Sequence, residues 1–162
     1  MKSYQQLSLK ANEGSQAGKY IPKIQISMVK EVYLSSTRYS CSEEIANNEI
    51  VEKELRHSDR EKFICIHLNI KNQIISYEVV SIGSLTSSIV HPREVFKAAI
   101  LANATSVVFL HNHPSGGTEP SLDDIEVTNR LCKAGRILGI SILDHLIITS
   151  NDYLSFKQKG LL

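Results

Sequence analysis

The chain has 162 residues, which is the size of one typical domain. Its composition, 42% hydrophobic and 22% charged with 8 glycines and 4 prolines, excludes a disordered chain, a collagen-like repeat and a disulfide scaffold. The formal charge of +1, from 18 Lys plus Arg and 17 Asp plus Glu, lacks the strongly basic balance that is usual in nucleic-acid-binding proteins.

The cysteines and the apolar segments indicate where the protein works. Three cysteines are widely spaced and form no C-x-x-C pair, so we expect free thiols in a reducing compartment (Cys41, Cys65, Cys132). The opening residues contain no apolar signal-peptide core, and no apolar run approaches the length of a membrane span. We therefore expect a cytoplasmic protein with no membrane partner.

The N-terminal third of the chain begins with a polar stretch. Residues 1–22 lack periodicity, and we expect them to be a flexible segment that precedes a single domain over residues 23–162. Apolar residues alternate with polar ones from Ile24 to Met28, which predicts a strand that continues towards Leu34. Ser42 to Leu55 spaces its apolar residues at helical intervals, with Ser42 as the expected N-cap.

The remaining pattern mixes strands and helices without a regular βαβ alternation, which predicts an α+β or mixed α/β fold. A hairpin is expected from 62–70 and 74–82, turning at 71–73. Pro92 is placed to begin a helix with an apolar stripe at Val95, Phe96, Ala99 and Ile100. After it we expect a strand over 105–110, a helix over 121–138 capped by Gly139, a strand over 140–149 and an amphipathic tail over 153–159.

The segment VVFLHNHPSGGTEPSLDD, residues 107–124, carries the chemistry. His111 and His113 stand two residues apart where a strand is expected to end, so their side chains point to the same side and can converge on one ion. Asp124 lies in the first turn of the next helix and could supply a third ligand. Three protein ligands and one open position are the arrangement of catalytic zinc, whereas structural zinc has four protein ligands.

Each of these residues also has a structural interpretation. Ser121 and Asp124 have the spacing of a capping box, which would by itself place a carboxylate at a helix start. The combined pattern is less common: H-x-H followed after ten residues by Asp is expected by chance in roughly one such chain in a hundred. The capping and the metal-binding interpretations are compatible for the same pair.

Two other motifs are excluded. His111, Asn112 and His113 spell HNH, but in HNH nucleases these residues are spread over a ββα unit. Zinc nucleobase deaminases combine H-x-E with P-C-x-x-C, and this chain has no such cysteine pair.

The pattern H-x-H-x7-S-x2-D, formed by His111, His113, Ser121 and Asp124, resembles the JAMM motif of JAB/MPN metalloproteases. The longer string HNHPSGGTEPSLDD and the segments LRHSDREKF, VHPREVFKAAILANA and LDHLIIT resemble the RadC branch of that superfamily, over about residues 27–160 with the motif core at 60–150. The resemblance implies a curved mixed β-sheet flanked by helices, with cytidine-deaminase-like architecture and a zinc site at a strand-to-helix junction. Typical RadC proteins carry a helix-hairpin-helix region before this domain, where this sequence has only a short arm.

The resemblance also assigns roles. One Zn²⁺ per chain would be held by His111, His113 and Asp124. Glu61, which precedes an expected strand, would be the general base, with Glu78 on the paired strand as the alternative. Ser121 would donate a hydrogen bond to the tetrahedral oxyanion. Without the resemblance, Glu61 is expected to be an exposed charge and Ser121 a helix cap.

The expected function is therefore a zinc-dependent peptidase or isopeptidase of the JAMM type, with a peptide or protein as substrate. A non-catalytic accessory protein of DNA repair or recombination is the alternative, and a metal-dependent nuclease is a third. Asp144 and His145 are expected to be ordinary strand residues, with support of the metal ligands as the alternative.

Overall fold

The computed structural model describes residues 38–83 and 90–162 and contains one five-stranded sheet of order β2-β1-β3-β4-β5. The strands are β1 (Lys62–Leu68), β2 (Ile74–Ile82), β3 (Ser106–Asn112), β4 (Ser141–Ile148) and β5 (Tyr153–Ser155). β3 and β4 are parallel, while the other neighbouring pairs are antiparallel, so the sheet is mixed. The single-domain boundaries expected from the sequence remain a prediction.

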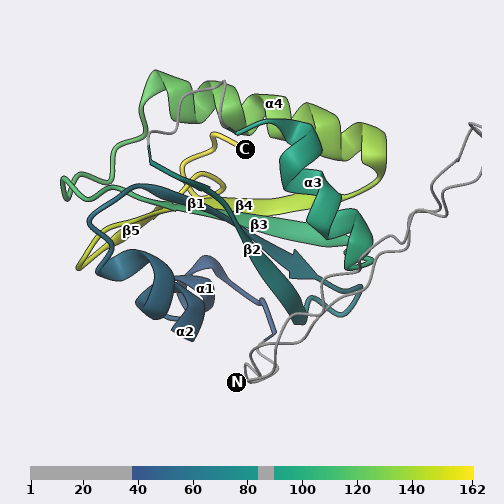
Figure 1. The fold of residues 1–162 in the computed structure, drawn as a ribbon, viewed down its shortest axis with the longest axis horizontal. Helices are drawn as coiled ribbons and strands as arrows, with labels where there is room; N and C mark the ends of the chain where they lie inside the picture. The colour runs from purple at the N-terminus through teal and green to yellow at the C-terminus, as the bar shows by residue number, and fades with distance from the viewer. Residues whose placement is uncertain (1–37, 84–89) are drawn as a thin grey trace, which may run out of the picture.

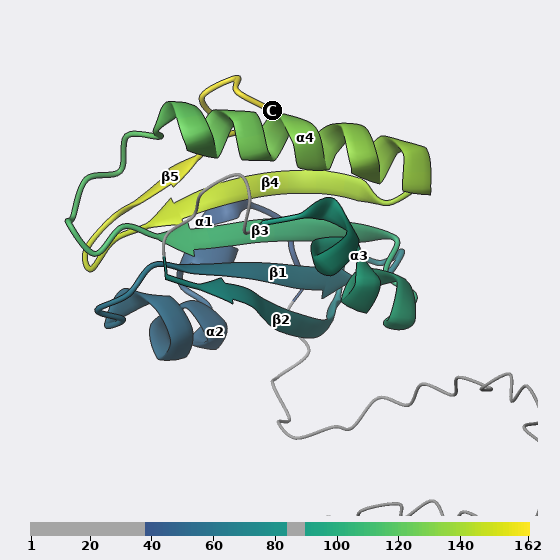
Figure 2. The same ribbon diagram turned by 45° about the horizontal axis from the view of Figure 1, so that its top comes forward.

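Helices cover both faces of the sheet (Figures 1 and 2). α3 (Pro92–Leu101) and α4 (Leu122–Leu138) lie on one face, while α1 (Ser42–Ala46) and α2 (Glu49–Val51) lie on the other. Each face has its own apolar core, because successive side chains of the strands point to opposite sides. α4 connects the parallel strands β3 and β4, which places its first turn beside the end of β3. The mixed α/β fold and the sheet flanked by helices are confirmed.

The prediction of one continuous helix from Ser42 to Leu55 is wrong. The helix breaks at residues 47–48, where the Asn48 side chain accepts a hydrogen bond from Ile50 N at 3.0 Å and starts α2. A π-helical turn follows over Glu52–Arg56. Ser42 is also not the N-cap, which is Cys41, because the Ser42 hydroxyl donates to the Asp144 carboxylate at 2.6 Å.

Both longer helices were predicted well. Pro92 is the first residue of α3, although Ile100 of the expected stripe is 53% exposed. α4 begins after Ser121 with a complete capping box and ends at Gly139, whose φ of 71° is left-handed. Glycine is favoured there because it has no Cβ to oppose this conformation.

The strands differ from the predictions mainly at their ends. β1 ends at Leu68 because the Asn69 side chain accepts hydrogen bonds from Lys71 N and Gln73 N and forms the turn. β3 continues to Asn112, and the expected tail begins with β5, which pairs with β4. The predicted flexible segment 1–22 and the strand from Ile24 lie outside the described residues.

Two further expectations can be compared with the described ranges. All three cysteines there are free thiols, as expected. Across 38–83 and 90–162, no helix combines the length and the apolar character needed to cross a membrane.

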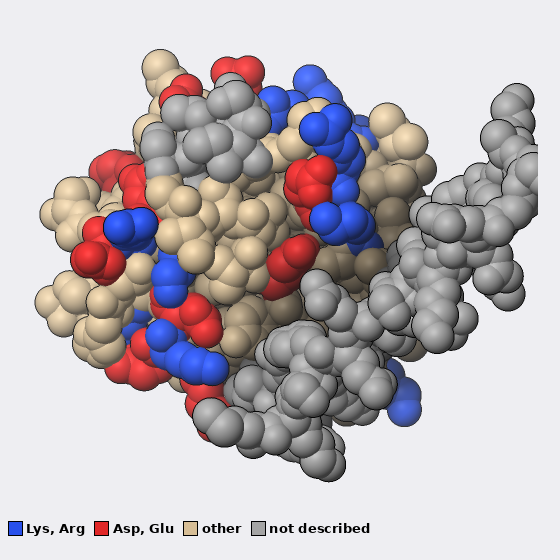
Figure 3. All heavy atoms as spheres, in the orientation of Figure 1, with Lys and Arg blue, Asp and Glu red and all other residues tan. Residues whose placement is uncertain are grey.

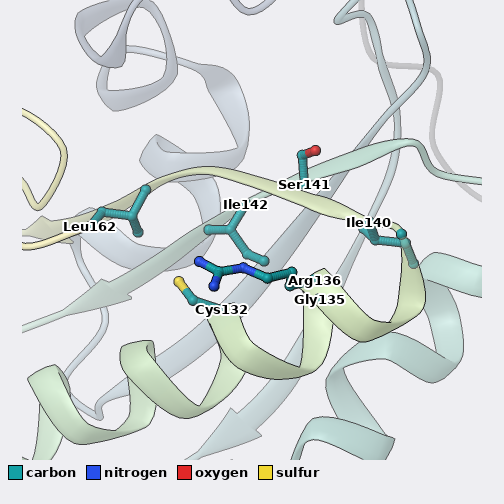
Figure 4. A pocket seen from close by; sticks show the side chains of 8 residues that line it. Cys132, Gly135, Arg136, Ile140, Ser141, Ile142 and Leu162 are labelled. Carbon is teal, nitrogen blue, oxygen red and sulfur yellow. The ribbon is translucent and has the colours of Figure 1, made fainter.

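The C-terminal half of α4 packs closely on β4 at Gly135. A Cβ at this position would overlap the Ile142 side chain and lie 2.7 Å from Ile140 O, so only glycine fits without displacement. Figure 4 shows Gly135 and Cys132 on α4, beside the start of β4. Both residues line a hollow of about 420 Å³. The hollow is lined from the far end of α4 and contains none of the residues of the JAMM-like motif.

Candidate metal centre

The candidate site lies where β3 ends and α4 begins. β3 is buried along its whole length, with His111 as its penultimate residue and His113 just beyond its end. Asp124 stands at the third helical position of α4, inside the capping box. The expectation that the motif occupies a strand-to-helix junction is therefore met by the fold.

Three potential ligand atoms converge there. His111 Nε2 lies 3.0 Å from His113 Nε2 and 3.3 Å from Asp124 Oδ1, and all three ligand atoms fall within 4.8 Å of one another. Ligands 2.0–2.1 Å from a tetrahedral zinc ion are about 3.3 Å apart, which matches this spacing. Among the described residues no fourth His, Cys, Asp or Glu joins the cluster, so its donor set fits an ion with one open position. His113 has the most exposed side chain of the three, at 15%, and marks the solvent side.

The orientation of His113 is fixed by its backbone neighbour. His113 Nδ1 lies 2.8 Å from Gly117 O. A carbonyl oxygen only accepts hydrogen bonds, so Nδ1 must carry the proton. Nε2 of the neutral ring then presents its lone pair to the cluster, which is the atom a metal requires.

The electrostatics of the cluster also suit a cation. Burial holds the pKa of the His111 imidazole below its ordinary value, which favours the neutral ring. Burial alone would raise the pKa of the Asp124 carboxyl, but the contacts with both imidazoles and with Ser121 outweigh it and hold that pKa well below its usual range. The contact with Asp124 raises the pKa of His113, against burial. A metal ion would compete with a proton for this imidazole.

Ser121 binds the other oxygen of the Asp124 carboxylate. Its hydroxyl donates to Oδ2 at 2.6 Å, and its backbone N–H donates to the same atom at 2.8 Å. The same hydroxyl accepts from Asp124 N at 3.1 Å. These contacts direct Oδ1 towards His111. The expected donation by Ser121 to an oxyanion remains a prediction, and it requires the hydroxyl to rotate away from Asp124, since a hydroxyl has one proton.

Glu61 lies near the cluster. It directly precedes β1, whose Phe63 pairs with His111 of β3. The negative charge of Glu61 raises the pKa of both imidazoles, although burial and the contacts with Asp124 have larger effects. The role of Glu61 as the base remains a prediction. Glu61 is half-buried and is not among the candidate ligands.

The structure does not bring Glu78, the alternative base, to the cluster. Glu78 lies on the edge strand β2, where it pairs with Cys65, further along β1 from the cluster. Burial raises the pKa of its carboxyl, and its charge interacts with Lys97 and Glu94 of α3. Glu78 therefore belongs to the surroundings of α3.

Asn112, between the two histidines, anchors the segment that carries Glu61. Its Oδ1 accepts from Lys62 N at 2.8 Å, and its Nδ2 donates to Arg60 O at 3.0 Å. The amide thus binds the backbone on both sides of Glu61. This role of Asn112 was not predicted, although the asparagine stands in the motif itself.

His145 and Thr128 lie behind the cluster. His111 Nδ1 is 2.8 Å from His145 Nε2, and His145 Nδ1 is 2.6 Å from Thr128 Oγ1. Contact between His145 and a candidate ligand was the alternative interpretation, and the structure favours it over an ordinary strand residue. Thr128 was not singled out from the sequence, where its helical spacing from Asp124 was the available signal.

Comparison with known proteins agrees with this geometry. The family model described as "RadC-like JAB domain" matches residues 40–161. A UPF0758 protein of Desulforamulus reducens is 50% identical over 122 residues, which cover 75% of this chain and 53% of the relative. UPF0758 proteins of Bacillus cereus and Bacillus anthracis are 55% identical over 108 residues, covering 67% of this chain and 48% of each relative. The chain thus spans about half the length of these curated relatives, whose names state no activity.

Proposed function

Because the chain belongs to the family of RadC-like JAB domains, we propose that it is a metal-dependent hydrolase that cleaves an amide bond in a peptide or protein. In this proposal one zinc ion per chain is held by His111, His113 and Asp124. The enzyme is then a peptidase or isopeptidase of the JAMM type.

The convergence of three acceptor atoms carries the proposal. His113 Nε2 and Asp124 Oδ1 face His111 Nε2 within 4.8 Å, and the hydrogen bond to Gly117 O leaves His113 Nε2 without a proton when the ring is neutral. Lone pairs and a carboxylate so close together repel one another unless a cation or a proton lies between them. A metal ion would satisfy all three atoms at once.

The side chains around the site suggest how hydrolysis proceeds. A bound zinc ion supplies Lewis-acid chemistry and lowers the pKa of water towards neutrality. Glu61 accepts a proton from the attacking water and returns it to the leaving amine. Asn112 holds the backbone of Glu61 in place through its contacts with residues 60 and 62. Ser121, after rotation of its hydroxyl, donates to the oxyanion.

Surface charge favours a peptide over a nucleic acid as the partner. On the face drawn in Figure 3, acidic side chains lie beside basic ones, without a continuous basic surface. With a formal charge of +1, the chain lacks the electrostatic attraction that nucleic-acid binding usually requires. Three free thiols support a reducing, cytoplasmic setting.

A hydrolysis assay with matched carboxylate variants tests the proposal. Zinc-loaded protein is incubated with a complex peptide library and with isopeptide-linked substrates, and new amines are quantified by mass spectrometry. Glu61→Gln should keep its zinc and lose about 10²- to 10⁴-fold in rate, as is typical for a missing general base. Glu78→Gln is the control and should keep the rate.

The outcomes distinguish the role of Glu61 from that of Glu78, and they also test whether the protein cleaves amide bonds. A Glu61→Gln variant as active as the wild type would contradict the role of Glu61, and loss in Glu78→Gln alone would transfer that role. Zinc-loaded wild type that cleaves no amide substrate would contradict the proposed activity.

A further inference from the structure

A chain of hydrogen bonds lies behind the metal cluster. It runs from His111 Nδ1 to His145 Nε2 at 2.8 Å, from His145 Nδ1 to Thr128 Oγ1 at 2.6 Å, and from Thr128 Oγ1 to Asp124 O at 2.6 Å. The hydrogen-bond chain therefore begins at one candidate ligand on β3 and ends at another on α4. His111, Thr128 and His145 are all buried, so water does not compete for these bonds.

The donor and the acceptor of each hydrogen bond follow from the final bond of the chain, from Thr128 Oγ1 to Asp124 O. Asp124 O can only accept, so the single Thr128 proton goes to it. Thr128 Oγ1 must then accept from His145, whose Nδ1 carries the proton and whose Nε2 is a bare acceptor. Because Nε2 of His145 accepts, Nδ1 of His111 donates. The proton of neutral His111 is thereby fixed on Nδ1, and its Nε2 lone pair faces the cluster.

The residues around His145 favour these hydrogen-bond directions. Its imidazole stacks on Phe156 at a centroid distance of 4.6 Å and meets Phe63 edge-on at 5.5 Å. Its backbone N–H donates to Asp144 Oδ1 at 2.8 Å. The side chain is buried, and its two nitrogens contact His111 and Thr128 rather than a carboxylate, which favours the neutral imidazole with Nε2 as an acceptor.

We propose that His145 and Thr128 are positioning residues that fix the tautomer and the ring orientation of His111, so that its Nε2 is prepared to bind the metal. The inference rests on the proposed function insofar as His111 Nε2 is a metal ligand. The tautomer itself is a property of the metal-free protein. Hydrogen-bond partners of metal-bound histidines typically contribute 10- to 100-fold in metal affinity.

Two substitutions of Thr128 test the inference. Thr128→Val keeps the shape of the side chain and removes the hydroxyl, whereas Thr128→Ser keeps the hydroxyl and is the matched control. Competition with a chromophoric chelator gives the zinc affinity of the full chain, and imidazole ¹⁵N–¹H correlation spectra give the tautomer of His111 without metal. The valine variant should bind zinc about 10- to 100-fold more weakly and show a mixture of His111 tautomers. The serine variant should match the wild type in both.

A variant of His145 tests the inference if the Thr128 variants do not fold. His145→Phe keeps a ring against Phe156 but removes both nitrogens, and it should weaken zinc binding by a similar factor. Unchanged zinc affinity and an unchanged His111 tautomer in the variants that fold would overturn the inference, even if their stability falls. A wild type that binds no zinc would contradict the proposed function alone. The His111 tautomer in its imidazole spectrum would still confirm or overturn the hydrogen-bond chain.

Discussion

The contacts of Ser121 allow its helix-capping and catalytic roles to be separated. Ser121→Ala removes the hydroxyl that accepts from Asp124 N at 3.1 Å and donates to Asp124 Oδ2 at 2.6 Å. Loss of an N-cap costs about 1 kcal/mol, and loss of the hydrogen bond to the carboxylate adds about 1 kcal/mol at this exposed position. The variant should therefore unfold about 4–8 °C lower than the wild type. Its zinc affinity should fall about tenfold, because Asp124 loses a partner that orients it.

Ser121→Gly is the matched variant, since glycine caps helices almost as well as serine but has no hydroxyl. It should recover about half of the lost stability, which is the part due to the cap, and none of the lost zinc affinity. Thermal unfolding of the metal-free protein and chelator competition measure the two quantities. Unchanged zinc affinity in both variants would refute the role of the hydroxyl in orienting Asp124, even if kcat falls because the hydrogen bond to the oxyanion is lost.

Three other changes have defined outcomes. Asn112→Leu should keep the zinc affinity and lower kcat about tenfold or more, because Glu61 loses the amide that positions it; an unchanged kcat would contradict this. Gly135→Ala should lower the free energy of unfolding in urea by about 1–3 kcal/mol, since the added Cβ would lie 2.7 Å from the backbone oxygen of Ile140, and an unchanged midpoint would refute this close contact. Burial lowers the pKa of His67 to about 4, so its stabilising effect is complete above its unfolded pKa of about 6.5 and is lost as the pH falls from there towards 4. The wild type should lose about 2 kcal/mol more stability between pH 7 and 5 than His67→Asn in urea unfolding, and equal losses would contradict the shift.

Features of the fold that depend on local sequence could be predicted. Pro92 marks the start of α3, and Ser121 and Gly139 mark the two ends of α4, because these residues act on their immediate backbone neighbours. The N-cap of α1 could not be predicted in this way, because the Ser42 hydroxyl binds Asp144, which lies 102 residues away along the chain.

The same distinction between local and long-range contacts applies to the candidate site. His111, His113 and Asp124 lie within one short segment, so their spacing on a strand and a helix start was sufficient to bring them together. His145 and Glu61 reach the cluster through the pairing of β4 and β1 with β3, which depends on register across the sheet. Hydrogen-bond directions, which decide the tautomers, require the positions of the individual atoms.

The central claim is that three side chains hold one metal ion at the junction of β3 and α4. A crystal of the zinc-loaded full chain, measured at the zinc absorption edge, tests it most directly. We predict a single anomalous peak about 2.0–2.2 Å from Nε2 of His111, Nε2 of His113 and Oδ1 of Asp124. A zinc-loaded crystal without a peak at these atoms, or with the ion bound through Nδ1 of either histidine, would contradict the account.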